Sequence, residues 1–121
     1  MNEHHIKEDI FKVLRLLSSN NDLNQRGISK YLNISLGKAN YLLKALTQKG
    51  FIEIKEFIEK DKKLKKIQYI LTINGFEEKA KLTYYFLQMK KKEYFELKKE
   101  AEENINLIQP SNKRMVKYVK Q

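Results

Sequence analysis

Residues 25–46 read QRGISKYLNISLGKANYLLKAL, and the spacing of this stretch decides the fold that we expect. Its apolar residues fall where two helices that cross at a tight turn must bury a face, at Ile28, Leu32, Ile34, Ala39 and Leu42. Ser29 and Ala39 are small where the helices come closest. Asn33 stands at the turn, and asparagine tolerates a left-handed backbone better than other non-glycine residues do. Together these features predict a helix-turn-helix.

The flanking sequence predicts the helices around this turn. Residues 3–19 carry one apolar stripe at helical spacing, which indicates an amphipathic helix. A short helix should begin at residue 24 or 25 and end near Leu32. Ser35 is a suitable N-cap for the next helix, which should end near Lys49 with Gly50 just beyond it.

The period of the pattern then changes from helical to strand-like. Residues 51–58, FIEIKEFI, have an apolar residue at roughly every second position, as a half-buried strand does. Residues 67–72, IQYILT, are rich in β-branched and aromatic side chains. Between them lies a charged segment, which we interpret as a long hairpin loop from Glu59 to Lys66.

A long helix should follow, capped by Thr72 or Asn74 and running from about Gly75 toward Ile108. It would be about 50 Å long, more than so small a domain needs internally. A heptad-like stripe predicts that it pairs with a second copy as a coiled coil, through Phe76, Ala80, Leu87, Tyr94 and Leu97. The alternative is a solvated, salt-bridged rod, which gains little from being helical.

The expected fold is therefore mainly α with a small β-hairpin: a winged helix-turn-helix followed by one long C-terminal helix. We divide the chain into a DNA-binding domain at residues 1–75, a dimerisation helix at 76–109 and a basic tail at 110–121.

Composition favours an anionic partner. The 121 residues carry a formal net charge of +10, and so basic a balance favours nucleic acid first. From Asn24 through Gly50 there is no Asp or Glu, yet there are five basic residues. A surface that approaches phosphates excludes carboxylates. We expect double-stranded DNA as the partner of this segment.

The candidate contacts follow from that expectation. The outward face of the second helix of the motif should read bases in the major groove, through Ser35, Leu36, Gly37, Lys38, Asn40, Tyr41 and Lys44. Backbone and wing contacts should come from basic and polar residues before and after it, namely Gln25, Arg26, Lys30, Lys60, Lys62, Lys63, Lys65 and Lys66.

With these motifs in place, the chain resembles the MarR family of bacterial regulators, most closely the small subgroup associated with exopolysaccharide gene clusters. The resemblance rests on ISKYLNISLGKANYLLKALTQKGFIEI and on Leu71-Thr72-Ile73-Asn74-Gly75, and it covers about residues 6–92. It implies a winged-helix fold and transcriptional control. The family's wing has Asp, one residue and Arg before Leu-Thr-x-x-Gly; here Asp61 and Lys63 are the nearest match. Larger members of the family have further helices at both ends, which form the dimer interface and an effector pocket. From the resemblance we expect this chain to dimerise through its last helix instead.

Other classes of function fit less well. The only histidines are the adjacent His4 and His5, and no zinc spacing, phosphate loop or nucleophile–base pair is present. We therefore expect no enzyme activity, no cofactor and no metal. No apolar run approaches the ~20 residues that cross a bilayer, so we expect a cytoplasmic protein associated with the nucleoid; a small-molecule effector is unknown. The alternative function is a winged-helix module for RNA binding or protein–protein assembly.

Overall fold

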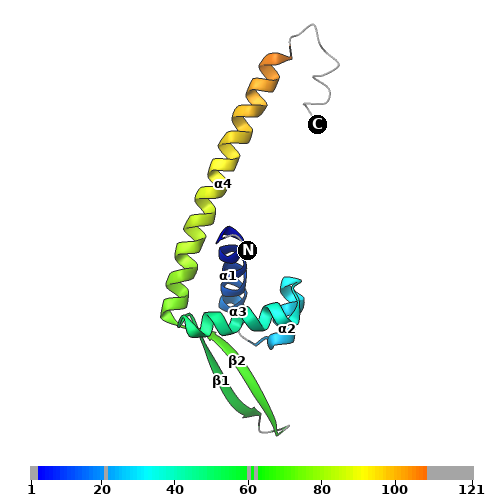
Figure 1. Ribbon diagram of the computed structural model, residues 1–121, viewed down its shortest axis with the longest axis vertical. Helices are drawn as coiled ribbons and strands as arrows, with labels where there is room; N and C mark the ends of the chain where they lie inside the picture. Colours follow the sequence, from blue (N-terminus) through cyan, green and yellow to red (C-terminus); the bar gives the residue numbers. More distant parts are fainter. Residues whose placement is uncertain (1–2, 21, 60, 62, 109–121) are drawn as a thin grey trace. The chain divides into compact units, whose positions relative to one another are not determined.

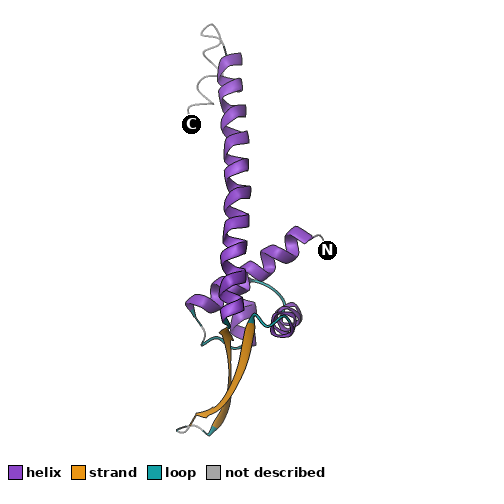
Figure 2. Cartoon of the chain, turned by 90° about the vertical axis from the view of Figure 1, so that its left-hand side faces the viewer, coloured by secondary structure: helices purple, strands orange, loops and turns teal. Residues whose placement is uncertain are grey.

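The computed structural model describes residues 3–20, 22–59, 61 and 63–108 (Figure 1). In these ranges the elements, which Figure 2 colours by type, follow in the order α1 (Glu3–Ser19), α2 (Gln25–Leu32), α3 (Leu36–Gln48), β1 (Ile52–Glu59), β2 (Leu64–Leu71) and α4 (Ile73–Leu107). The chain separates into two compact units, residues 1–83 and 84–121. The mainly helical fold with one hairpin and a long last helix confirms the predicted fold class.

The core of the first unit is built from one face of each element. α1 packs against α2, α3 and β2, and α3 packs against α2 and β1. The side chains at the centre are fully buried and aliphatic, namely Val13, Leu14, Ile28, Leu46 and Ile52. Each such side chain contributes about 1.5–3 kcal/mol when it leaves water. Burial also raises the pKa of Tyr69, whose side chain lies at the edge of this core.

The turn between α2 and α3 has the left-handed conformation that the sequence predicts. Asn33 has φ 55° and ψ 48°, and its N–H donates to the Lys30 carbonyl at 3.2 Å. The Ile34 N–H donates to the Ser29 carbonyl at 3.0 Å, so the end of α2 is closed. α3 then begins with Ser35 as its N-cap, whose Oγ accepts from the Lys38 N–H at 3.0 Å.

Replacing Asn33 tests whether this turn depends on backbone conformation. Alanine should lower the free energy of unfolding by about 1 kcal/mol, because its Cβ crowds a left-handed backbone. Glycine should cost nothing measurable, since it adopts positive φ freely. Urea denaturation of Asn33→Ala and Asn33→Gly gives both values. Equal destabilisation by the two would show that the exposed asparagine side chain matters instead of φ.

The hairpin is longer in its strands and shorter in its loop than the sequence analysis predicts. β1 and β2 pair antiparallel over their whole lengths, from Ile52 opposite Leu71 to Glu59 opposite Leu64. The predicted loop of residues 59–66 is therefore wrong, because Lys65 and Lys66 lie in β2. The aliphatic part of a lysine side chain is compatible with a strand. The run of charged residues therefore did not reveal that these two lysines pair with β1. Lys63, at φ 51°, makes the turn with its N–H donating to the Glu59 carbonyl at 2.8 Å.

The hairpin is joined to α4 at a junction centred on Thr72. Its Oγ1 donates to the Gly50 carbonyl at 2.6 Å and accepts from the Gly75 N–H at 3.0 Å. Its own N–H donates to the Phe51 carbonyl at 3.1 Å. Of the two predicted caps, Thr72 is therefore the one used. α4 begins at Ile73, two residues before the predicted start. Gly50, at φ 79°, ends the preceding helix as predicted.

Candidate nucleic-acid interface

One side of α3 is exposed and the other is buried. Ala39, Leu42, Leu43 and Leu46 form the buried side. On the opposite side Gly37, Tyr41 and Lys44 are exposed, Tyr41 to 68%. These three positions are spaced by four and three residues, so they share one stripe along the helix. The sequence analysis selected all three for DNA contact.

Gln48 continues this stripe and was missed by the sequence analysis. It lies four residues after Lys44 in the last turn of α3 and is exposed. Extending the helical period by one more turn would have found it. The exposed stripe of α3 is thus Gly37, Tyr41, Lys44 and Gln48, with no carboxylate on the helix. An amide and a lysine can both donate to base edges or phosphates.

Three other predicted readers lie beside this stripe. Ser35 is exposed and caps the helix, so its hydroxyl already accepts one backbone hydrogen bond. Leu36 is 44% exposed at the N-terminal turn. Asn40 is half-buried at the edge of the stripe. They are placed to contact a ligand that approaches the N-terminal half of α3.

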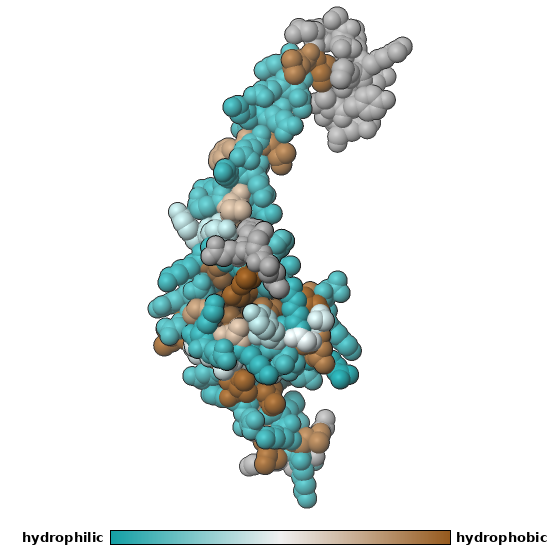
Figure 3. All heavy atoms as spheres, in the orientation of Figure 1, coloured by the Kyte–Doolittle hydropathy of each residue, from teal (hydrophilic) through white to brown (hydrophobic). Residues whose placement is uncertain are grey.

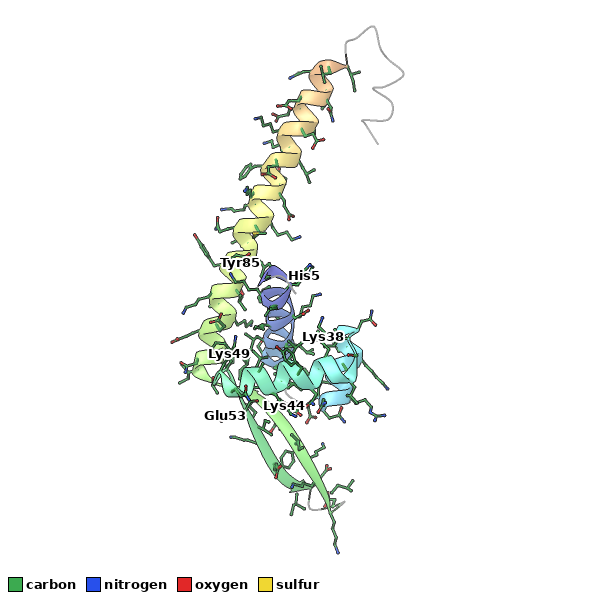
Figure 4. All side chains as sticks on the ribbon, viewed as in Figure 1. His5, Lys38, Lys44, Lys49, Glu53 and Tyr85 are labelled. Atoms are coloured by element: carbon green, nitrogen blue, oxygen red, sulfur yellow. The ribbon has the colours of Figure 1, made fainter. Side chains whose placement is uncertain are left out.

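Lys38 leaves α3 on a different side from Lys44. The two are six residues apart, which places their side chains about 120° apart around the helix axis. Lys38 lies toward α1, where its Nζ is 3.0 Å from Asp9 Oδ2 (Figure 4). The sequence analysis placed both lysines on the outward face. In the structure Lys44 is exposed, whereas Lys38 is half-buried and paired.

The predicted backbone contacts on α2 are partly accessible. Arg26 and Lys30 are exposed. Gln25 is half-buried, and its Nε2 makes a long hydrogen bond of 3.5 Å to the Leu36 carbonyl. Asn24 caps α2, with its Oδ1 accepting from the Gly27 N–H at 2.7 Å. Gln25 therefore links the start of α2 to the start of α3, and the two cations remain available.

The wing presents lysines from its turn and from β2, whereas β1 carries carboxylates together with the exposed Lys55. Lys63, Lys65 and Lys66 are exposed, and Lys65 Nζ lies 3.1 Å from Glu56 Oε2 on the neighbouring strand. Lys66 faces the opposite side of the hairpin, across from Phe57. Lys60 and Lys62 lie outside the described residues. The described lysines of the wing therefore lie on both faces of the hairpin, and one of them is paired with a carboxylate.

The predicted dimer residues on α4 are exposed. Leu87 is 51%, Tyr94 60% and Leu97 65% exposed. Phe76 and Ala80, in the first unit, are exposed as well. In Figure 3 apolar side chains interrupt the hydrophilic surface of α4.

The described ranges hold neither a candidate metal centre nor a candidate membrane span. They contain no group of three or more His, Cys, Asp or Glu residues able to hold a metal ion. None of the described helices is long and apolar enough to cross a membrane.

Residues 10–53 match the family model described as winged helix-turn-helix DNA-binding. The chain carries a winged helix-turn-helix. The matched residues end at the start of β1, so the rest of the hairpin and α4 lie outside this match. No curated protein matches the chain in sequence.

Solved structures of MarR-family regulators share the fold. A Staphylococcus aureus MarR in complex with salicylate and kanamycin is 20% identical with a TM-score of 0.59, and the alignment covers 90% of this chain and 73% of that one. The S. aureus MepR–DNA complex is 20% identical, with a TM-score of 0.54 and coverage of 84% and 79%. PcaV, a transcriptional regulator from Streptomyces coelicolor, is 14% identical, with a TM-score of 0.56 and coverage of 80% and 77%. At these identities the likeness concerns the fold.

Proposed function

We propose that this protein is a MarR-like transcriptional regulator that binds double-stranded DNA in a sequence-specific manner. The observation that carries the proposal is the exposed stripe of α3. It combines a glycine, an aromatic residue, a lysine and an amide on a helix without carboxylates, in a winged helix-turn-helix. In this fold class the corresponding helix enters the major groove and the wing contacts the flanking backbone. The structure of MepR with DNA is a precedent for the fold.

We further propose that the protein acts as a homodimer through α4. Leu87, Tyr94, Ala101 and Ile108 recur every seven residues, which is the period of a coiled-coil seam. Two copies would present two α3 helices to half-sites about 34–36 Å apart, so a palindromic site is expected. Such a regulator works at the chromosome, so we propose that it lies in the bacterial cytoplasm with the nucleoid. Its proposed role needs no catalytic group. Exopolysaccharide genes are its proposed targets on the sequence resemblance alone.

Iterative selection of random-sequence duplex DNA tests this function. Wild type should recover one inverted-repeat motif. Tyr41→Ala and Lys44→Ala should each weaken binding to that motif about 10- to 100-fold, because one good base contact is worth about 1–3 kcal/mol. If Lys44 contacts a phosphate, its loss should also reduce the salt slope by about one unit.

Lys81→Ala is the matched control, because Lys81 is an exposed lysine on α4 and its loss changes the net charge equally. It should retain nearly wild-type affinity for the selected motif. Weak binding with no shared motif, together with stronger competition by single-stranded RNA, would contradict the proposal. That outcome would favour the alternative of an RNA-binding module.

A further inference from the structure

The ion pair between Asp9 and Lys38 brings a carboxylate to a segment that has none of its own. Residues 24–50 contain no Asp or Glu, but α1 places Asp9 Oδ2 at 3.0 Å from Lys38 Nζ. The Asp9 side chain is 14% exposed and that of Lys38 is 37% exposed. The charge of Lys38 is thus balanced by Asp9, which lies on α1, 29 residues earlier in the chain.

This pair is more sheltered than other ion pairs of the structure. Lys12 and Glu8, at 3.5 Å, are 51% and 41% exposed. Lys90 and Glu93, at 3.6 Å, are 76% and 57% exposed. Exposed neighbours of this kind are weak and easily screened by salt. Asp9 is screened less, because the protein covers most of its side chain. The Asp9–Lys38 pair is therefore the one we expect to persist in solution.

The position of Lys38 makes this pairing relevant to DNA. Lys38 lies in the first turn of α3, directly after Gly37 at the start of the exposed stripe. A phosphate or base edge that approaches this turn meets an ammonium whose charge a carboxylate already neutralises. A phosphate that pairs with Lys38 therefore competes with Asp9 for the ammonium. Displacement of Asp9 leaves a mostly covered carboxylate without its cation, which is unfavourable.

We propose that Asp9 limits the affinity of the protein for DNA, acting as an intramolecular competitor that holds Lys38 away from phosphate. This inference rests on the proposed binding of DNA by α3. In the free protein α3 then offers DNA one cation fewer than its sequence contains. For a chain of net charge +10, such a contact restrains binding to random DNA, which is driven by phosphate neutralisation.

Asp9→Asn tests the competition directly. The substitution preserves shape and releases Lys38. Binding to a random-sequence duplex should become about fivefold to tenfold tighter at 0.1 M salt, and the slope of log K against log salt should steepen by about 0.9, the value for one more neutralised phosphate. Fluorescence anisotropy at salt concentrations from about 50 to about 300 mM measures both.

Glu8→Gln is the matched control. It changes the net charge by the same amount on the adjacent residue of α1, and it releases Lys12 instead of Lys38. It should change affinity less than about twofold, since a distant surface charge acts weakly through salt. If Glu8→Gln tightens binding as much as Asp9→Asn does, the gain is a general charge effect and the inference is overturned.

Lys38→Gln tests whether the tighter DNA binding of Asp9→Asn comes from the release of Lys38. In the wild-type background it should cost little on random DNA, whereas in the Asp9→Asn background it should remove the whole gain. Weaker binding of a folded Asp9→Asn variant would show that Asp9 positions Lys38 for DNA instead of competing for it. Circular dichroism establishes that each variant is folded. Wild type that fails to bind any duplex would refute the proposed function itself, whereas equal binding of wild type and Asp9→Asn would refute this inference alone.

Discussion

Gly75→Ala is expected to lower the free energy of unfolding by about 3 kcal/mol, although alanine is normally the better helix former. A Cβ at this position would lie 2.0 Å from the Phe51 carbonyl oxygen and 2.7 Å from Leu71 Cδ2. The Phe51 oxygen cannot withdraw easily, because it accepts the Thr72 N–H at 3.1 Å. The methyl group would force α4 away from the base of the hairpin.

Thermal and urea unfolding of the variant give this loss. A fall in melting temperature of roughly 10 °C or more corresponds to it for a domain of this size. Gly37→Ala is the control, because a Cβ at Gly37 meets no atom within 4 Å. It should leave stability unchanged or raise it by about 0.5 kcal/mol. Equal melting temperatures for the two variants would show that the junction between β2 and α4 is not closely packed.

If the proposed dimer forms through α4, Leu87→Glu is expected to convert the protein to a monomer and to weaken binding to the selected inverted-repeat motif about 100-fold or more. A symmetric seam contains each residue twice, so one substitution places two unpaired charges in the interface. A dimer joins two DNA-binding domains, so binding of the first raises the effective concentration of the second at its half-site. Separate monomers lose this avidity. Analytical ultracentrifugation gives the oligomeric state, and mobility-shift titration gives the affinity.

Gln88→Glu provides the comparison for this variant. Gln88 is the next residue, is exposed, and gains the same negative charge about 100° around the helix from Leu87. It should remain a dimer and retain most of its DNA affinity. A Leu87→Glu protein that sediments as a dimer, like the control, would place the dimer contacts elsewhere in the chain.

Short-range features of the fold could be predicted because their causes are local. Asn33 adopts the left-handed turn, Ser35 caps α3, and Gly50 ends it with positive φ. Each depends on the conformational preference of one residue and on hydrogen bonds within a few positions of it. The exposed stripe of α3 follows in the same way from helical periodicity, which also reaches Gln48, four residues after Lys44.

Features that join distant segments were decided only by the tertiary structure. Lys65 and Lys66 belong to β2 because the ladder with β1 extends over them, which a lysine-rich stretch does not reveal. Thr72 is chosen over Asn74 as the cap because its hydroxyl also reaches the Gly50 carbonyl, 22 residues earlier.

The sequence by itself determined the helix-turn-helix, the hairpin and the long helix, since helical and strand periods and capping residues act over a few positions. The tertiary structure decided which cations remain available. Asp9 reaches Lys38 only because α1 packs against α3, and Gly75 matters only because Phe51 lies against it. Contacts of this kind depend on how whole helices and strands pack against one another. The local pattern of residues within any one stretch does not specify that packing.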